Sequence, residues 1–322
     1  MDLTGWTPMY SYFAAGQLIL DCCHTGRRRF TESFFGDTID QVTRDQAALL
    51  FRHQTTVDEA KEWTRQRPGL SPAGFIFHIS RCGSTLVSQM LAALPENRVL
   101  SEPTALNAVI RAALLDARIP RATLLDWLRT AVRLLGCPLD GESRYIVKLD
   151  CWHVLALPLI VEAFPDTPWI FLYRNPAEVL VSQARNPGAW TVTSALEPEI
   201  FGVKREDVPS ISRPEYLARM LGRMCAAGLE HRGCGRGLLV NYDELPDFVC
   251  GRLPAHFGIT FSQAELDRMW MVSRADAKTP QLIYSDDRQT KRLAVTSELH
   301  AIVDQWLSPL FERLEAVRKA GE

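Results

Sequence analysis

Short apolar runs alternate with helical patterns along the chain from residue 74 onward. The apolar runs are continuous, which is typical of strands covered by helices on both faces of a sheet. The pattern therefore predicts an α/β fold: a doubly wound, mostly parallel sheet with helices on both faces. The predicted strands are Gly74–Ile79, Arg98–Ser101, Tyr145–Leu149, Trp169–Tyr173 and Gly237–Val240, and the predicted helices lie near 84–93, 104–117, 121–135, 153–164, 176–185, 213–230, 246–257 and 262–272.

Three stretches depart from this alternation. Residues 1–70 are aromatic and polar, with a helix expected around 40–66, so we predict a partly helical N-terminal extension before an α/β domain over 71–322. Residues 186–212 interrupt the alternation, which is typical either of a functional lid or of a disordered surface loop. Residues 296–318 form an amphipathic helical pattern, which fits a core helix and a homodimer contact equally well.

Composition and charge narrow the class of protein. The 322 residues are 47% hydrophobic and 23% charged, which is ordinary for a globular chain. A net charge of −2 gives no basic field, so we expect no nucleic-acid partner. The eight cysteines show no paired spacing and indicate reduced thiols in a cytoplasmic protein. No long uncharged apolar run and no basic leader is found, so we expect a soluble chain with no membrane contact.

The first site candidate follows the first strand of the alternating region. The run Arg81-Cys82-Gly83-Ser84-Thr85 lies between that strand and a helix, which is the order of a P-loop-type phosphate-binding loop. Backbone N–H groups, the helix dipole, two hydroxyls and the Arg81 guanidinium would all favour an anion there. A nucleoside-triphosphate loop has Lys directly after its second Gly and another Gly five positions earlier, where this chain has Ser84 and His78. The loop therefore predicts a phosphate-like ligand other than a magnesium nucleoside triphosphate.

A second candidate follows the strand Trp169–Tyr173. Arg174 stands at its carboxyl end, Asn175-Pro176 opens a helix, and Ser182 follows eight residues after the arginine. Arg174 and Ser182 are therefore suited to hold one phosphate from two directions. The alternative is a salt bridge from Arg174 to Glu178, with the serine merely on the helix.

Together the two motifs resemble those of the PAPS-dependent sulfotransferases, in particular their bacterial and tyrosylprotein-type branch. That family has Arg/Lys-x-Gly-[Ser/Thr]-Thr for the 5′-phosphosulfate, and an Arg followed eight residues later by Ser for the 3′-phosphate. The resemblance covers roughly residues 74–260 and implies PAPS as the sulfuryl donor and PAP as the product. It also implies a family-type Tyr near the nucleotide, in Tyr242-Asp243-Glu244-Leu245. The donor-binding residues so implied are Arg81, Cys82, Gly83, Ser84, Thr85, Arg174, Ser182 and Tyr242.

The same resemblance implies a catalytic base. Glu102 closes the second strand, 21 residues after Arg81, and tyrosylprotein-type members have a general-base Glu at a similar spacing. Its alternative role is to begin the following helix, because Glu-Pro-Thr is an acceptable helix entry. Lys148, at the end of the third strand, is placed to add a cation beside Arg81 at the reacting centre. With fixed cations in these places, we expect no metal, and we expect His78 to be a core histidine.

Several features depart from the family or stay open. The Arg-Lys-Gly-x-x-Gly segment that many members lay over the 3′-phosphate is missing, and the C-terminal region offers only the basic residues Lys278, Arg288, Lys291 and Arg292 in its place. The acceptor is a small molecule or a peptide, with Trp190 as the expected contact. The helix start beside Cys82 would lower the pKa of its thiol, although a small, well-fitting residue is the plainer role.

Two other functions remain alternatives. A P-loop kinase of a small metabolite is kept open by Asp150, an acid after the third strand that suits Mg²⁺. A non-catalytic nucleotide-binding module would have intact loops with an inert Glu102. The leading prediction is a cytoplasmic sulfotransferase that moves the sulfuryl group of PAPS to a hydroxyl or amine.

Overall fold

The structure is a computed structural model that describes residues 2–44, 52–138, 141–192, 195–275 and 295–321. At its centre lies a five-stranded parallel sheet in the order β5-β6-β4-β7-β8. All of these strands lie close to their predicted bounds, and the predicted fold class is confirmed. The strands are β4 (Pro72–His78), β5 (Asn97–Ser101), β6 (Arg144–Lys148), β7 (Trp169–Tyr173) and β8 (Gly237–Asn241).

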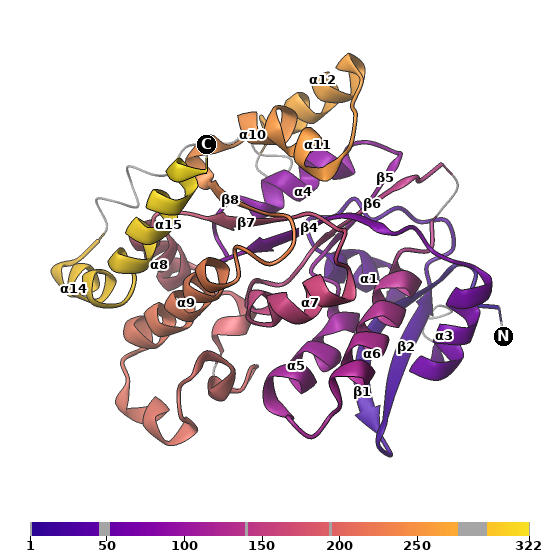
Figure 1. Cartoon of the computed structure of the whole chain (residues 1–322), viewed down its shortest axis with the longest axis horizontal. Coiled ribbons are helices and arrows are strands. Elements are labelled where there is room, and N and C mark those ends of the chain that lie inside the picture. The colour runs from indigo at the N-terminus through magenta and orange to yellow at the C-terminus, as the bar shows by residue number, and fades with distance from the viewer. Residues whose placement is uncertain (1, 45–51, 139–140, 193–194, 276–294, 322) are drawn as a thin grey trace.

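Helices cover both faces of this sheet, with α4, α10, α11 and α12 on one side and α5, α6, α7 and α9 on the other (Figure 1). The central strands are therefore buried on both faces, and Phe75, Ile76 and Phe77 of β4 are at most 1% exposed. The helices are α4 (Ser84–Ala92), α5 (Asn107–Leu115), α6 (Arg121–Leu135), α7 (Leu157–Ala163), α8 (Pro176–Arg185), α9 (Arg213–Glu230), α10 (Asp247–Cys250), α11 (Arg252–Phe257) and α12 (Gln263–Val272).

The strand order creates a crevice at the carboxyl ends of β4 and β6. The helix that follows β4, α4, lies on one face of the sheet, while the helix that follows β6, α7, lies on the other (Figure 1). Because the two connections diverge from neighbouring strands, the backbone leaves an opening between them. Ligands of open α/β sheets bind at such positions, so the fold itself selects this edge as the site.

Residues before the central sheet form a second, antiparallel sheet in the order β1-β2-β3, with β1 (Trp6–Ala14), β2 (Gln17–His24) and β3 (His53–Thr56). Among the described residues, helices α1 (Phe35–Thr43) and α3 (Val57–Gln66) accompany it. The continuous helix expected around 40–66 is therefore wrong. The Thr56 side chain accepts from the N–H of Glu59 and caps α3 at a strand end, which prevents the helix from extending backward.

The first two strands meet at a tight turn. Ala15 and Gly16 have φ values of +48° and +78°, the backbone of a two-residue hairpin turn that matches strand twist. The hairpin contacts the α/β core, because the Thr104 hydroxyl donates to the carbonyl of Met9 and the N–H of Ala108 donates to the Ser11 hydroxyl at 3.3 Å. The extension is thereby fixed beside the helices that follow β5.

The described residues of the two remaining stretches form short helices. Within 186–212, described residues form short 3-10 helices over Ala189–Thr191, Pro198–Phe201 and Arg205–Ser210, and the side chains of Ile200 and Phe201 are buried. The single helix expected over 296–318 is instead α14 (Ser297–Trp306) followed by α15 (Ser308–Ala320). A proline in the first turn of α15 cannot continue a preceding helix, which explains the break.

Across the described ranges, none of the helices combines the length and the apolar character needed to cross a membrane.

Candidate active site

The loop between β4 and α4 has the backbone of an anion cradle. Ser80, Arg81 and Gly83 adopt positive φ values of +70°, +53° and +84°, so the chain turns sharply before α4 begins at Ser84. Consecutive turns of this kind direct backbone N–H groups into one concavity, and the first N–H groups of a helix have no partner within it. Ser84 and Thr85 are buried polar residues on the same wall. The loop thus presents several donors to one point.

Gly83 is required by both its conformation and its neighbours. A Cβ at this position would lie 2.6 Å from Leu245 Cδ1 and 2.8 Å from the ring of Tyr242. Because residue 83 has no side chain, Tyr242 from the end of β8 packs directly against the loop. The late tyrosine motif and the phosphate loop are therefore in contact.

The Cys82 side chain points into the sheet. Its Sγ donates to the carbonyl of Leu172 at 3.3 Å, and burial raises the pKa of the thiol to about 11. Loss of solvent outweighs the backbone hydrogen bonds and nearby cations that lower this pKa, so the plainer role of a small, well-fitting residue describes Cys82. Only the backbone of Cys82 remains to contact a ligand.

Glu102 and Lys148 form an ion pair at the ends of β5 and β6. Lys148 Nζ lies 2.6 Å from Glu102 Oε1, and Glu102 N donates to the Lys148 carbonyl at 2.7 Å. Lys148 is 0% exposed, and its ammonium also lies 4.8 Å from the centre of the Phe34 ring. Burial opposes the charged carboxylate, yet the Lys148 ammonium and His78 hold the pKa of Glu102 well below its usual range. The carboxylate is therefore ionised when no ligand is bound.

The backbone of Glu102 is strained. Its φ of +62° lies in the left-handed region, which costs a non-glycine residue about 1–2 kcal/mol. Such outliers persist where surrounding contacts enforce them, and they cluster at functional sites. Here the enforcing contact is the hydrogen bond to the Lys148 carbonyl, which aligns residue 102 with the end of the neighbouring strand.

Two further ionisable groups stand behind this pair. Asp150 accepts from the N–H of Cys151 at 2.7 Å, and burial together with the charge of Glu102 raises the pKa of Asp150. His153, in the 3-10 helix Cys151–Ala156 (η2), has its Nε2 3.1 Å from Asn107 Oδ1, and burial lowers its pKa to about 3. His153 is therefore neutral near pH 7, and the positive charge that Glu102 contacts is that of Lys148, at 2.6 Å.

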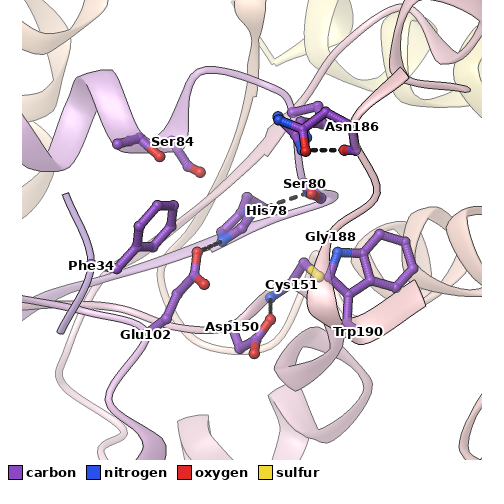
Figure 2. Close-up of a pocket in the computed structure, with 12 residues that line it drawn as sticks. Phe34, His78, Ser80, Ser84, Glu102, Asp150, Cys151, Asn186, Gly188 and Trp190 are labelled. Atoms are coloured by element: carbon purple, nitrogen blue, oxygen red, sulfur yellow. Dashed lines mark hydrogen bonds and ion pairs between the residues drawn. The ribbon is translucent and has the colours of Figure 1, made fainter. Parts of the chain in front are cut away.

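The phosphate loop and Glu102 face one cavity of about 420 Å³ (Figure 2). Arg81 Nη2 donates to the carbonyl of Asn186 at the end of α8, so its guanidinium closes one side of the cavity. Trp190, 8% exposed, and Phe34 stand on opposite sides of it in the view of Figure 2. The cavity is lined by Phe34, His78, Ser80, Arg81, Ser84, Thr85, Glu102, Asp150, Cys151, Asn186, Gly188 and Trp190.

Arg174 is buried beside the cavity and does not line it. Its Nε lies 2.7 Å and its Nη2 2.6 Å from Glu178 Oε2, and its guanidinium stacks 4.0 Å from the centre of the Tyr242 ring. The alternative interpretation, a salt bridge to Glu178, describes these contacts. Ser182 is half-buried on α8, and neither Ser182 nor Tyr242 lines the 420 Å³ cavity.

The two arginine-bearing turns are nevertheless neighbours. They follow β4 and β7, which pair directly in the sheet. Tyr242 contacts the loop at Gly83 and the guanidinium of Arg174, while Gln183 Nε2 of α8 donates to Ser80 Oγ at 3.0 Å. The structure therefore brings both motifs to one region, with Arg174 already engaged.

Sequence reasoning missed several lining residues, among them His78 and Phe34. His78 was expected in the core, and it is only 3% exposed, yet it lines the cavity beside Glu102. Its place at the carboxyl end of a strand was the available signal. Phe34 comes from the N-terminal extension and carries no local signal of its role. The basic residues Lys278, Arg288, Lys291 and Arg292 lie outside the described residues.

Comparison with known proteins agrees with these motifs. Residues 72–245, more than half of the chain, match the profile of the sulfotransferase family. No curated protein matches the sequence significantly.

Several solved structures that are similar to this chain are sulfotransferases. The sulfotransferase STF9 from Mycobacterium avium has 14% identity over 78% of this chain and 81% of its own, with a TM-score of 0.46. A sulfotransferase from Alicyclobacillus acidocaldarius has 14% identity over 77% of this chain and 96% of its own, with a TM-score of 0.47. Mouse sulfotransferase SULT7A1, solved with PAP, has 12% identity over 82% and 94%, with a TM-score of 0.42.

Proposed function

This chain belongs to the sulfotransferase family, and we propose that it moves the sulfuryl group of PAPS to an acceptor hydroxyl or amine with Glu102 as the general base. The observation that carries this proposal is the shared cavity. One wall bears the anion-binding loop with Arg81, and another bears an ionised carboxylate paired with a buried Lys148. Transfer of a group between two oxygens requires donors that hold the anionic substrate and, opposite them, a base that accepts the proton of the acceptor.

The residues present suit the 5′ side of such a donor. Backbone donors, two buried hydroxyls and Arg81 converge on one concavity, and Ser84 occupies the place where a triphosphate loop has its Lys. Arg174, the residue predicted to bind the 3′-phosphate, is less available, because it already pairs with Glu178. A 3′-phosphate would have to take part of that guanidinium from the carboxylate, with Ser182 and Tyr242 beside it.

PAPS would supply an activated sulfuryl group, and the chain would supply charge and proton transfer. Glu102 takes the acceptor's proton as the new bond to sulfur forms. The guanidinium of Arg81 faces the negative charge that develops as the bond from sulfur to the 5′-phosphate breaks. The ammonium of Lys148 is buried and does not line the cavity, so it adds to the positive potential there from behind the wall. The acceptor enters between Phe34 and Trp190, which suits a small molecule or a peptide side chain with an apolar body.

The low pKa of Glu102 is compatible with a base. In the absence of ligand it reflects the opposite charge of Lys148 at 2.6 Å. Negative oxygens near that ammonium weaken its hold on the carboxylate and raise the carboxylate's affinity for a proton. The base therefore gains strength when the donor is present.

The test combines turnover with binding. We expect Glu102→Gln to abolish transfer of labelled sulfate from PAPS, while PAP binding measured by calorimetry persists. Loss of PAP affinity in this variant would contradict the assignment of the base, and absence of PAP binding to the parent protein would contradict the proposed function.

A kinase is the second candidate because Asp150 lines the same cavity. Burial raises the pKa of Asp150, however, and its carboxylate already accepts from the N–H of Cys151 at 2.7 Å, so it is a poor ligand for Mg²⁺. A thermal-shift comparison of PAP, PAPS, ATP and ADP, with and without Mg²⁺, separates the two. Stabilisation by PAP without metal is expected, and stabilisation by ATP only with Mg²⁺ would favour the kinase. A non-catalytic module would bind PAP and show no turnover.

A further inference from the structure

His78 has a fixed arrangement of its two ring nitrogens. Its Nδ1 accepts a hydrogen bond from the N–H of Ser80 at 3.0 Å, in the turn where Ser80 has a φ of +70°. Since Nδ1 must keep its lone pair for this bond, the single proton of a neutral imidazole resides on Nε2. Burial lowers the pKa of His78, so the ring is neutral near pH 7. Figure 2 shows this ring between the turn and Glu102.

The Nε2 proton is directed at Glu102. Nε2 lies 3.4 Å from Glu102 Oε1, a long contact that still joins the two side chains. Within the described residues, this buried nitrogen makes no hydrogen bond of standard geometry, either to Glu102 or to another group. Two acceptors lie near this ring, the Glu102 carboxylate and the backbone of Leu149, and only the carboxylate is charged. Contacts of this kind to a catalytic group tighten when an active site is filled.

The two oxygens of Glu102 therefore have different roles. Oε1 accepts from the Lys148 ammonium at 2.6 Å and lies 3.4 Å from His78 Nε2. In the described part of the chain, Oε2 accepts no hydrogen bond, and the side chain keeps 23% of its surface exposed to the cavity. Two donors on one oxygen fix the plane of the carboxylate.

We propose that His78 is a positioning residue: its Nε2–H, together with Lys148, holds Glu102 Oε1 so that Oε2 faces the acceptor. The proposal rests on the function proposed above. His78 does not relay protons, because its only lone pair is bound to the N–H of Ser80. The same ring therefore joins the two halves of the site, with one nitrogen on the anion-binding turn and the other on the base.

The two nitrogens can be tested separately by amide side chains. In His78→Asn the amide oxygen takes the place of Nδ1, so the bond from Ser80 N–H is kept and the donor to Glu102 is lost. In His78→Gln the amide nitrogen takes the place of Nε2, so the donor to Glu102 is kept and the acceptor for Ser80 is lost.

We expect the two variants to separate catalysis from binding. His78→Asn should lower kcat by roughly tenfold to a hundredfold, part of what a general base contributes, with PAP affinity unchanged within about twofold. His78→Gln should recover most of kcat and instead weaken PAP binding, because the turn loses its bond. A purely structural histidine predicts equal losses in both variants, and that result would overturn the proposal.

The pH dependence of activity provides a second test of the role of His78. Activity requires the Glu102 carboxylate, so it falls as pH drops through the pKa of Glu102. Loss of the His78 donor raises that pKa, and the acid limb should move to higher pH in His78→Asn but not in His78→Gln. The ionisable groups facing Glu102 are His78 from β4, Lys148 and Asp150 from the end of β6, and Cys151 and His153 from η2.

Of these groups, Asp150 is the one that would distort the profile. Its pKa is raised, so its own titration changes the charge beside Glu102. The comparison should therefore be repeated in an Asp150→Asn background. An acid limb that does not differ between the His78 variants there would contradict the role of Nε2.

Nuclear magnetic resonance tests the same claim without any ligand. In protein labelled with ¹⁵N-histidine, we expect the signal that disappears in His78→Asn to report a neutral ring protonated at Nε2 and unprotonated at Nδ1. In protein labelled at glutamate carboxyl carbons, the pKa of Glu102 should rise in His78→Asn and stay low in His78→Gln.

A His78 ring protonated at Nδ1, or charged at pH 7, would overturn the proposal. These spectra need neither PAPS nor an acceptor. A failure of the sulfotransferase assignment is thus distinguished from a failure of His78 to position Glu102.

Discussion

Replacing Lys148 by Met removes the charge that keeps Glu102 ionised, with little change in side-chain volume. Lys148 is 0% exposed, and its Nζ lies 2.6 Å from Glu102 Oε1. The Met side chain retains the apolar stem that packs in the core and lacks the ammonium. The substitution therefore leaves Glu102 as a largely buried carboxylate without its cationic partner, with the neutral His78 ring 3.4 Å away.

The size of the effect follows from the burial of the pair. Removing one partner of a buried ion pair costs about 3–5 kcal/mol. The Glu102 side chain remains 23% exposed, so water solvates part of the stranded charge. We therefore expect a loss near the lower bound, about 3 kcal/mol in the free energy of unfolding at pH 7.

The pH dependence has a definite sign. In the parent protein the pKa of Glu102 is lowered, so the pair stabilises the fold above the unfolded carboxyl pKa of about 4.3, and this is lost as pH falls through the folded value. In Lys148→Met, burial dominates and raises the pKa of Glu102, so the neutral form is favoured and stability falls as pH rises. The difference between the two proteins should grow from pH 4 to pH 8.

Guanidinium chloride unfolding at several pH values measures this difference. The matched control is the double variant Glu102→Gln/Lys148→Met, which removes both charges and should cost much less than the single change. A cost that is the same at pH 4 and pH 8, or a double variant no more stable than Lys148→Met, would refute the reasoning.

Three further predictions concern the remaining parts of the site. Arg174→Ala should weaken PAP binding by about 2–4 kcal/mol, roughly thirtyfold to a thousandfold, because a phosphate loses its charged donor. Calorimetry checks this, with Arg174→Ala/Glu178→Gln as the control for the stranded carboxylate, and unchanged affinity would remove Arg174 from the site. Gly83→Ala should lower both the melting temperature and PAP affinity, since its Cβ would meet the Tyr242 ring at 2.8 Å and its φ is +84°. A variant as stable and as tightly binding as the parent would contradict this account of the loop. Cys82 should resist iodoacetamide at pH 8 in the native protein, because burial raises its pKa to about 11, and modification seen by mass spectrometry before unfolding would contradict its burial.

Much of the fold was predictable because local signals mark element ends. The helix predicted over 121–135 has those bounds in α6, where Pro120 precedes the first turn and Gly136 ends the last. The order of the strands was not predictable, since buried parallel strands have similar apolar runs. The hairpin before residue 25 was missed because its aromatic and polar residues give no clean alternation.

The site was predictable where it depends on strand ends. The register pairs Ser101 with Lys148, so Glu102 necessarily follows beside the lysine once β5 and β6 are neighbours. Phe34 was not predictable, because its place over the ammonium depends on how the N-terminal extension packs. The salt bridge from Arg174 to Glu178 was predictable, because residues four positions apart lie close together on a helix.

Arg81, Lys148 and Arg174 share one property: each already contacts an oxygen of the protein. Arg81 donates to the Asn186 carbonyl, Lys148 pairs with a carboxylate at 2.6 Å, and Arg174 does so at 2.6 Å. An anionic donor must therefore compete for its cations, so its net affinity is smaller than the number of positive charges suggests. Under the proposed function this competition has a use at Lys148. The same ammonium that keeps Glu102 ionised also makes it a weak base, so a donor whose negative charge offsets that of the ammonium strengthens the base when the sulfuryl group is in place.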